Sequence, residues 1–124
     1  MRLFLPALSC LLAAGLATIA IAADPIDNCA TVLGSLSVEL RIARDLPPGK
    51  RSTFFCAKRY TPLVGAERAR VLRSLGTPDR TTEDGGWSYL FASRHGERAP
   101  GTTELVFRFD GVGQVAAVDC HRTG

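Results

Sequence analysis

The sequence is poor in the side chains that most often carry catalysis. It has only two histidines, and His95 lies in a strongly hydrophilic loop. No G-x-S-x-G or H-E-x-x-H motif occurs, and no glycine loop of the phosphate-binding kind is present. Cys120 and His121 are adjacent, and neighbours on a strand point to opposite faces, which argues against a nucleophile–base pair. We therefore expect a protein that is not an enzyme and that has no cofactor.

A strong excess of one charge is also lacking. The chain has 15 Lys and Arg against 12 Asp and Glu, a net charge of +3, and the charges are interspersed. This balance gives no electrostatic footprint for nucleic acid. Internal repeats and low-complexity tracts are absent, and the cysteines follow neither a zinc-binding nor a C-x-x-C spacing. We therefore expect neither a nucleic-acid partner nor a metal site.

One long apolar run is present, at the start of the chain. It follows a short positive region at Arg2 and ends in Ala20-Ile21-Ala22, an A-x-A cleavage pattern, with the first acidic residue, Asp24, just beyond. These are the parts of a secretory signal peptide over residues 1–23, although the run approaches the length of an uncleaved membrane anchor. We favour cleavage. Because no cysteine stands where a lipoprotein signal needs one, we expect a periplasmic chain without an integral membrane span, and its association with the outer membrane stays open.

Three cysteines follow the predicted signal peptide: Cys29, Cys56 and Cys120. Export permits disulfides, and three cysteines allow one bridge with one residue left over. We favour a Cys29–Cys56 bridge, because a helix followed by a returning segment brings these two residues together. Pairing of Cys56 with Cys120, or of Cys29 with Cys120, stays open.

The first element after the signal peptide is ambiguous. Over Asp27–Asp45 the apolar side chains follow one helical stripe, whereas Leu36–Ile42 alternates as a strand does. The total length and the cap residues at Asp27 or Asn28 favour a helix over residues 28–44, with the strand as the alternative. In a helix, Val38 and Ile42 lie on the back face, either as a partner patch or as two ordinary exposed apolar residues.

The rest of the chain predicts one further helix and a small sheet. Gly65–Leu75 is the helix, with Val71, Leu72 and Leu75 on its apolar face and Gly76 as the residue with positive φ that ends it. Before it, the segment 52–60 is either a helical turn or extended, with Phe54, Phe55 and Cys56 in the core. The strands expected are Trp87–Ser93, Thr103–Asp110 and Gln114–Cys120. Short links make them an antiparallel meander, with one face packed on the helices and the other largely wet.

A set of residues in fixed order spans half of the mature chain. It consists of Gly65, Val71, Leu75, Gly76, Pro78, Trp87, Tyr89, Phe109, Asp110 and Gly113. Their spacings in "VGAERARVLRSLGTPDRTTEDGGWSYLF…TELVFRFDGVGQV" resemble the SmpA/OmlA (BamE-like) domain family. Ala66-Glu67 stands where the family usually has Met-Thr, so Gly65 is expected to cap the helix.

The resemblance implies a fold and an organisation. The fold is α+β, a two-layer sandwich of N-terminal helices on a three-stranded antiparallel meander. Residues 24–60 are then an N-terminal extension with a helix, residues 61–120 the SmpA/OmlA-like helix and sheet, and residues 121–124 a tail. The ten residues of the set have structural roles in this interpretation.

The resemblance also implies a function. Members of the family are protein-interaction modules without catalytic residues, so we expect a non-enzymatic module that supports outer-membrane or envelope protein assembly through a protein partner in the cell envelope. The alternative is a periplasmic inhibitor-like or ligand-sequestering binding protein of related fold. A third hypothesis, of a different class, is thiol chemistry by the left-over cysteine.

Overall fold

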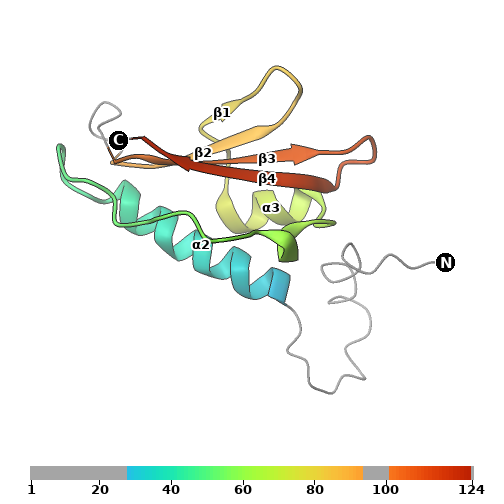
Figure 1. Ribbon diagram of the computed structural model, residues 1–124, viewed down its shortest axis with the longest axis horizontal. Coiled ribbons are helices and arrows are strands. Elements are labelled where there is room, and N and C mark those ends of the chain that lie inside the picture. Colours follow the sequence, from blue (N-terminus) through green and yellow to red (C-terminus); the bar gives the residue numbers. More distant parts are fainter. Residues whose placement is uncertain (1–27, 94–100, 124) are drawn as a thin grey trace.

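The computed structural model describes residues 28–93 and 101–123. The predicted signal peptide over residues 1–23 and His95 lie outside these ranges. The described chain is an α+β protein of two layers, in which two α-helices cover one face of a four-stranded antiparallel sheet (Figure 1). No helix within the described ranges has the length and apolar character that a membrane span requires.

Helix α2 (Asn28–Arg44) confirms the helical interpretation of this segment over the strand. The predicted stripe includes Val32, which is only half-buried. Its other members are buried: Cys29, Leu33, Leu36, Leu40 and Ala43. The stripe extends over the whole element, while the alternation covers only its second half, so the longer pattern decides the structure. Val38 and Ile42 are exposed on the back face, as expected.

Helix α3 (Arg68–Leu75) begins three residues later than predicted, and Gly65 does not cap it. Glu67 is the cap residue and makes no side-chain cap bond. The reason lies in the sheet, because Gly65 N–H donates to Val115 O (2.9 Å) and Val115 N–H donates to Ala66 O (2.8 Å). Residues 65–67 are thereby held at the sheet edge, with Gly65 in a turn at φ +94° and Glu67 in an isolated bridge to Gln114. Leu72, predicted on the apolar face, is 44% exposed, because Val71 and Leu75 alone make the contact with the core.

The sheet has four strands rather than three. Its order is β1 (Arg80–Thr81), β2 (Trp87–Phe91), β3 (Thr103–Phe109) and β4 (Val115–Arg122). The three predicted strands correspond to β2, β3 and β4. Strand β1 was missed because two residues carry no periodicity, and β4 continues two residues beyond its predicted end at Cys120.

The core lies between the sheet and the helices. Tyr89, Phe91, Leu105 and Phe107 are fully buried on the helix-facing side of the sheet, and the rings of Tyr89 and Phe107 meet edge to face at 5.7 Å. Trp87 is only half-buried and packs at the margin of this cluster. A single core therefore joins α2, α3 and the sheet.

The segment between α2 and the short 3-10 helix η2 (Thr61–Leu63) is extended and lies beside β4. Phe54 stacks on Phe91 with ring centroids 4.2 Å apart, but Phe55, also predicted in the core, is 63% exposed. Extended backbone turns neighbouring side chains to opposite sides, so only one of the two rings faces inward.

A disulfide joins Cys56 to Cys120, so the favoured Cys29–Cys56 pairing is wrong. The chain after α2 runs back to η2, which contacts both α2 and β4, and on this path Cys56 meets Cys120 of β4. Arg122 fixes this path by donating to Ser52 O (2.8 Å) and Phe54 O (2.7 Å). The expected left-over thiol is also not found, because none of the cysteines in the described ranges is free and Cys29 is fully buried.

Candidate functional site

The residues behind the family resemblance lie mainly in the scaffold. Gly76 ends α3 with φ +81° and ψ −168°, the positive φ that was predicted, and its carbonyl accepts a hydrogen bond from Tyr89 Oη (2.8 Å). Burial raises the pKa of Tyr89, so the phenol stays a neutral donor at physiological pH. This bond attaches the end of the helix to the centre of the sheet. Val71 and Leu75 are buried beside it, and Pro78 lies half-buried in the following turn.

The other members of the set build the β3–β4 hairpin and its margin. Asp110 Oδ1 accepts from the N–H groups of Val112 (3.0 Å) and Gln114 (2.9 Å), as expected of a turn residue. Gly113, with φ +85°, completes this turn. Trp87 meets the ring of Phe109 edge to face at 5.0 Å, so these residues form packing and turn contacts.

A buried polar cluster on the outer face of the sheet was not predicted. Glu104 is 6% exposed and Ser88 is fully buried, although both lie on the face expected to be wet. Ser88 Oγ and Arg80 (2.7 Å) donate to one carboxylate oxygen of Glu104, and His121 Nε2 lies 3.2 Å from the other. Alternation places Glu104 on this face, but nothing in the sequence indicates that its neighbours surround it.

The charge of this cluster is balanced. Burial raises the pKa of Glu104, but the hydrogen bonds from Ser88 and Arg80 and the charges of Arg80 and His121 outweigh it, so the pKa lies below that of an ordinary glutamate. A carboxylate of this kind stays ionised at neutral pH and is poorly suited to general acid catalysis. The hydroxyl of Ser88 is buried and inaccessible to a substrate. The cluster therefore fits a structural role.

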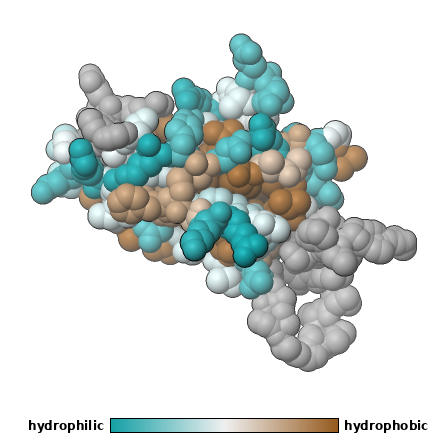
Figure 2. All heavy atoms as spheres, in the orientation of Figure 1, coloured by the Kyte–Doolittle hydropathy of each residue, from teal (hydrophilic) through white to brown (hydrophobic). Residues whose placement is uncertain are grey.

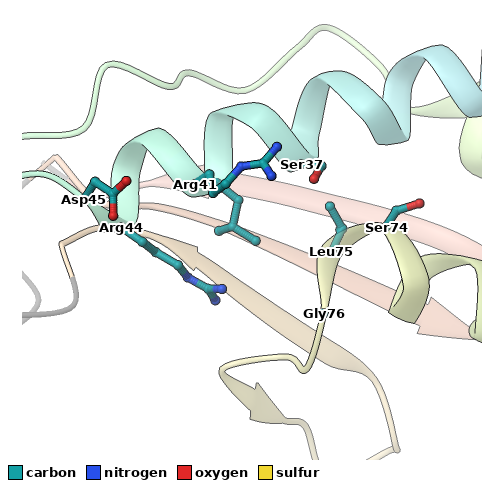
Figure 3. A pocket seen from close by; sticks show the side chains of 8 residues that line it. Ser37, Arg41, Arg44, Asp45, Ser74, Leu75 and Gly76 are labelled. Carbon is teal, nitrogen blue, oxygen red and sulfur yellow. The ribbon is translucent and has the colours of Figure 1, made fainter.

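A hollow of about 400 Å³ lies between α2 and α3 (Figure 3). Arg41 and Arg44 line it from α2, and Leu75 and Gly76 from the end of α3. Arg44 is already engaged, because it donates both to Asp79 Oδ1 (2.9 Å) and to Oδ2 (2.8 Å). The carboxyl ends of both helices face this hollow, and their dipoles disfavour an anion. The hollow is therefore a weak candidate for a ligand site.

A groove of about 460 Å³ follows the edge of β4. One wall is the strand and the other is the segment around η2, and together they contribute Ala57, Lys58, Arg59, Tyr60, Thr61, Val64, Ala116, Ala117, Val118, Asp119 and Cys120. Figure 2 shows hydrophobic surface over the middle of β4 with hydrophilic side chains beside it. Apolar and charged side chains thus line the groove together, as they do in protein interaction sites.

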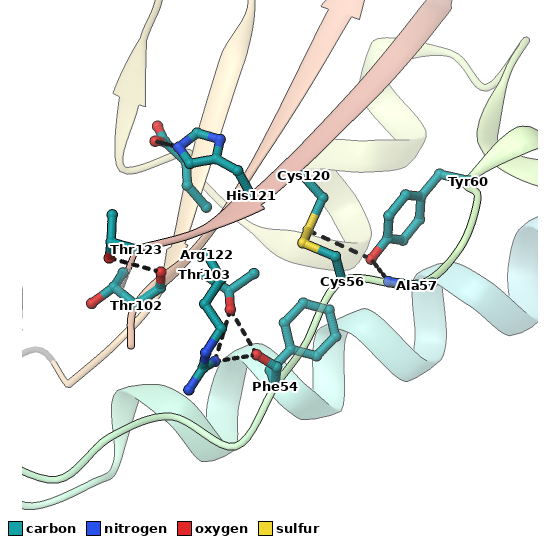
Figure 4. Close-up of a disulfide and its surroundings, with 11 residues drawn as sticks. Phe54, Cys56, Ala57, Tyr60, Thr102, Thr103, Cys120, His121, Arg122 and Thr123 are labelled. Carbon is teal, nitrogen blue, oxygen red and sulfur yellow. Dashed lines mark hydrogen bonds and ion pairs between the residues drawn. A yellow bond between two sulfur atoms is a disulfide. The ribbon is translucent and has the colours of Figure 1, made fainter. Parts of the chain in front are cut away.

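The walls of the groove are held together covalently and by hydrogen bonds (Figure 4). The Cys56–Cys120 disulfide attaches the segment before η2 to β4. Tyr60 Oη accepts from Ala57 N–H (2.9 Å) and donates to Cys120 Sγ (3.8 Å). The groove is thus preformed, which reduces the entropy that binding a partner would cost.

The two edges of the sheet differ in how their backbone groups are satisfied. At the β2 edge, β1 pairs with Trp87 and Ser88, and Leu90 N–H donates to Asp79 Oδ2 (2.7 Å). At the β4 edge, Val115 bonds with residues 65 and 66, and beyond it no described residue pairs with the outward backbone groups of the strand. Because such a row of backbone groups is a template for pairing, the β4 edge is the best candidate interaction site.

Neither a metal site nor a similarity to known proteins gives further support to the β4 edge as the candidate site. The described part of the chain has no cluster of three or more His, Cys, Asp or Glu placed to hold a metal ion. Comparison with family models, curated proteins and solved structures finds no match for this chain. The resemblance to the SmpA/OmlA family therefore stays a prediction based on the residues quoted above. No sequence pattern indicates the β4 groove, because its two walls lie far apart in the chain.

Proposed function

We propose that this protein is a periplasmic, non-enzymatic interaction module of the SmpA/OmlA (BamE-like) type, which supports outer-membrane or envelope protein assembly. The observation that carries the proposal is the open edge of β4 beside a preformed groove. The disulfide between Cys56 and Cys120 suits an exported protein, because such bonds persist in oxidising compartments. The α+β architecture, with helices on one face of a meander, agrees with the family's fold at the level of layers and strand direction.

The roles of individual residues support the same proposal. Gly76, Tyr89 and Asp110 form turns and bonds within the scaffold, so they shape a surface and do not perform a reaction. The most polar buried cluster, around Glu104, lacks an accessible nucleophile. Thiol chemistry, the third hypothesis, has no free cysteine in the described ranges to use.

The test is capture of the protein with its partner from the compartment where it works. A tagged full-length chain is expressed from its own promoter, crosslinked reversibly in intact cells and purified from the envelope fraction. We expect proteins of outer-membrane assembly to be enriched over a tagged exported control. Recovery of the chain with no envelope protein above that control contradicts the proposal. A periplasmic enzyme, inhibited by the purified chain at stoichiometric amounts, would identify an inhibitor-like module instead.

A further inference from the structure

We propose that the β4 edge binds an extended, acidic peptide segment of the partner protein by strand addition. The inference rests on the proposed function and specifies the kind of partner. Thr123 N–H donates to Thr102 O (2.9 Å), so the backbone groups of residue 123 point toward β3. Antiparallel strands direct successive residues alternately to each side, so the N–H and C=O groups of Val118 and Cys120 point away from β3. In the described chain, no residue bonds with these groups.

Apart from a bulge opposite Arg108 and Phe109 and the segment joined to it at Cys120, the strand lacks the devices that usually protect an edge. Natural edges are short or carry lysine, proline or inward-pointing charge. Strand β1, at the opposite edge, has two residues, whereas β4 has eight and contains neither lysine nor proline. Ala116 and Ala117 are small enough to let another backbone approach. The charge of Asp119 is paired with Arg108 (3.1 Å), so it does not repel a strand by itself.

The charges beside the groove specify the occupant. Lys58 and Arg59 are exposed on the wall opposite β4, and neither forms an ion pair with a described residue. In an extended segment paired with β4, every second side chain would lie over this wall. Carboxylates at these positions of the segment could form ion pairs with Lys58 and Arg59. The other side chains on that face would meet Val64 and Val118, which favour apolar partners. The partner segment is therefore an acidic strand with apolar side chains.

A second copy of this chain fits the edge less well. Pairing two β4 edges antiparallel, about a two-fold axis, places both copies of the segment around η2 on the same side of the joined sheet. Lys58 and Arg59 of both copies then come together without a carboxylate between them, and such like charges repel. A heterologous acidic peptide has no such conflict.

The experiment uses the full exported chain with its disulfide formed. A random linear peptide library is selected against this protein, and the selected peptide is synthesised with a fluorescent label for anisotropy measurements. We expect it to combine apolar residues with Asp or Glu. In ¹⁵N-labelled protein, the amide signals of Val118 and Cys120 should shift most on binding, and those of α2 should not.

Val118→Pro is the decisive variant, because it removes one outward N–H and leaves the β3 ladder intact. Val118→Ala is its matched control, since it shortens the side chain and keeps the N–H. We expect Val118→Pro to weaken binding about 10-fold relative to Val118→Ala, from one lost hydrogen bond and an unpaired peptide carbonyl. Equal affinities of the two variants would overturn the proposal.

Two further comparisons keep the test decisive if Val118→Pro fails to fold. Lys58→Glu with Arg59→Glu should weaken binding about 5-fold, while Arg73→Glu on α3 should not change it. N-methylation of the peptide amides that face β4 should abolish binding, and methylation of the intervening amides should not.

Other results separate this inference from the proposed function. Signal shifts confined to the helices, or sedimentation showing that the chain occupies its β4 edge by dimerising, would overturn strand addition. If no peptide binds while envelope proteins are still captured in cells, strand addition fails and the interaction module stands. If envelope proteins are not captured but the peptide binds at β4, the assembly role fails and the edge site stands.

Discussion

Gly76 ends α3 with φ +81°, a conformation that residues with a β-carbon rarely adopt. Space does not restrict a larger residue there, because a β-carbon added at this position would meet nothing within 4 Å. Gly76→Ala should therefore lower the free energy of unfolding by about 1–3 kcal/mol through backbone strain alone. Urea denaturation at 25 °C measures the change.

Gly34, in the middle of α2, is the matched control for Gly76→Ala. Its surroundings are equally open, but its backbone is helical. Gly34→Ala should stabilise the protein by about 0.5–1 kcal/mol, because alanine loses less backbone entropy in a helix. Effects of the same sign at both positions would contradict this account of Gly76.

Glu104 makes stability depend on pH. Its pKa in the folded protein is lowered, so its contribution is fully present above the unfolded-state value, about 4.3, and is lost as pH falls through the folded value. The free energy of unfolding should thus decrease as the solution is acidified below about pH 5. In Glu104→Gln, denaturation curves at a series of pH values should show a shallower decrease. An unchanged slope would mean that Glu104 does not titrate in this range.

At the scale of elements, periodicity predicts what is long and regular. The stripe from Cys29 to Ala43 identifies α2, and alternation identifies β2, β3 and β4. Periodicity does not indicate β1, because a strand of two residues is too short to show a period. It also does not indicate where α3 begins, because residues 65–67 bond with the sheet instead. The path of the chain around Phe55 depends on tertiary contacts, so its exposure was predicted wrongly.

The Cys56–Cys120 disulfide closes a loop with a sequence separation of 64 residues. In the chain-entropy model, a loop of this length contributes about 4 kcal/mol to stability by restricting the unfolded chain. The double variant Cys56→Ser/Cys120→Ser should lose about that amount in urea denaturation. Since β4 and the segment before η2 form the groove, its peptide affinity should fall as well.

An unchanged free energy of unfolding in this double variant would contradict the structural role of the bridge. Replacing Cys29 does not serve as a control, because its side chain is fully buried in the core. A better comparison is the single variants Cys56→Ser and Cys120→Ser, each of which breaks the same bridge and should show the same loss of stability as the double variant.

At the scale of the whole molecule, the sequence predicts the layers but not the candidate site. The two layers follow from the apolar faces of α2 and the strands. The groove requires residues 57–64 to lie beside residues 116–120, and no sequence motif indicates that these segments are neighbours. The status of β4 as an open edge depends likewise on the order of strands in the sheet. Resemblance to a family therefore predicts a class of function, and the structure specifies the surface on which it can be tested.

We propose that the β4 surface contacts a partner protein in the cell envelope. A photoreactive phenylalanine analogue at exposed Ala116 in the groove, compared with the same residue at Arg73 on α3, tests it in living cells. With the analogue at Ala116, we predict a discrete crosslinked adduct with an envelope protein. The analogue at Arg73 should give no such adduct, and adding Val118→Pro to the Ala116 variant should reduce its amount. No adduct from Ala116, or the same adducts from both positions, would contradict the claim.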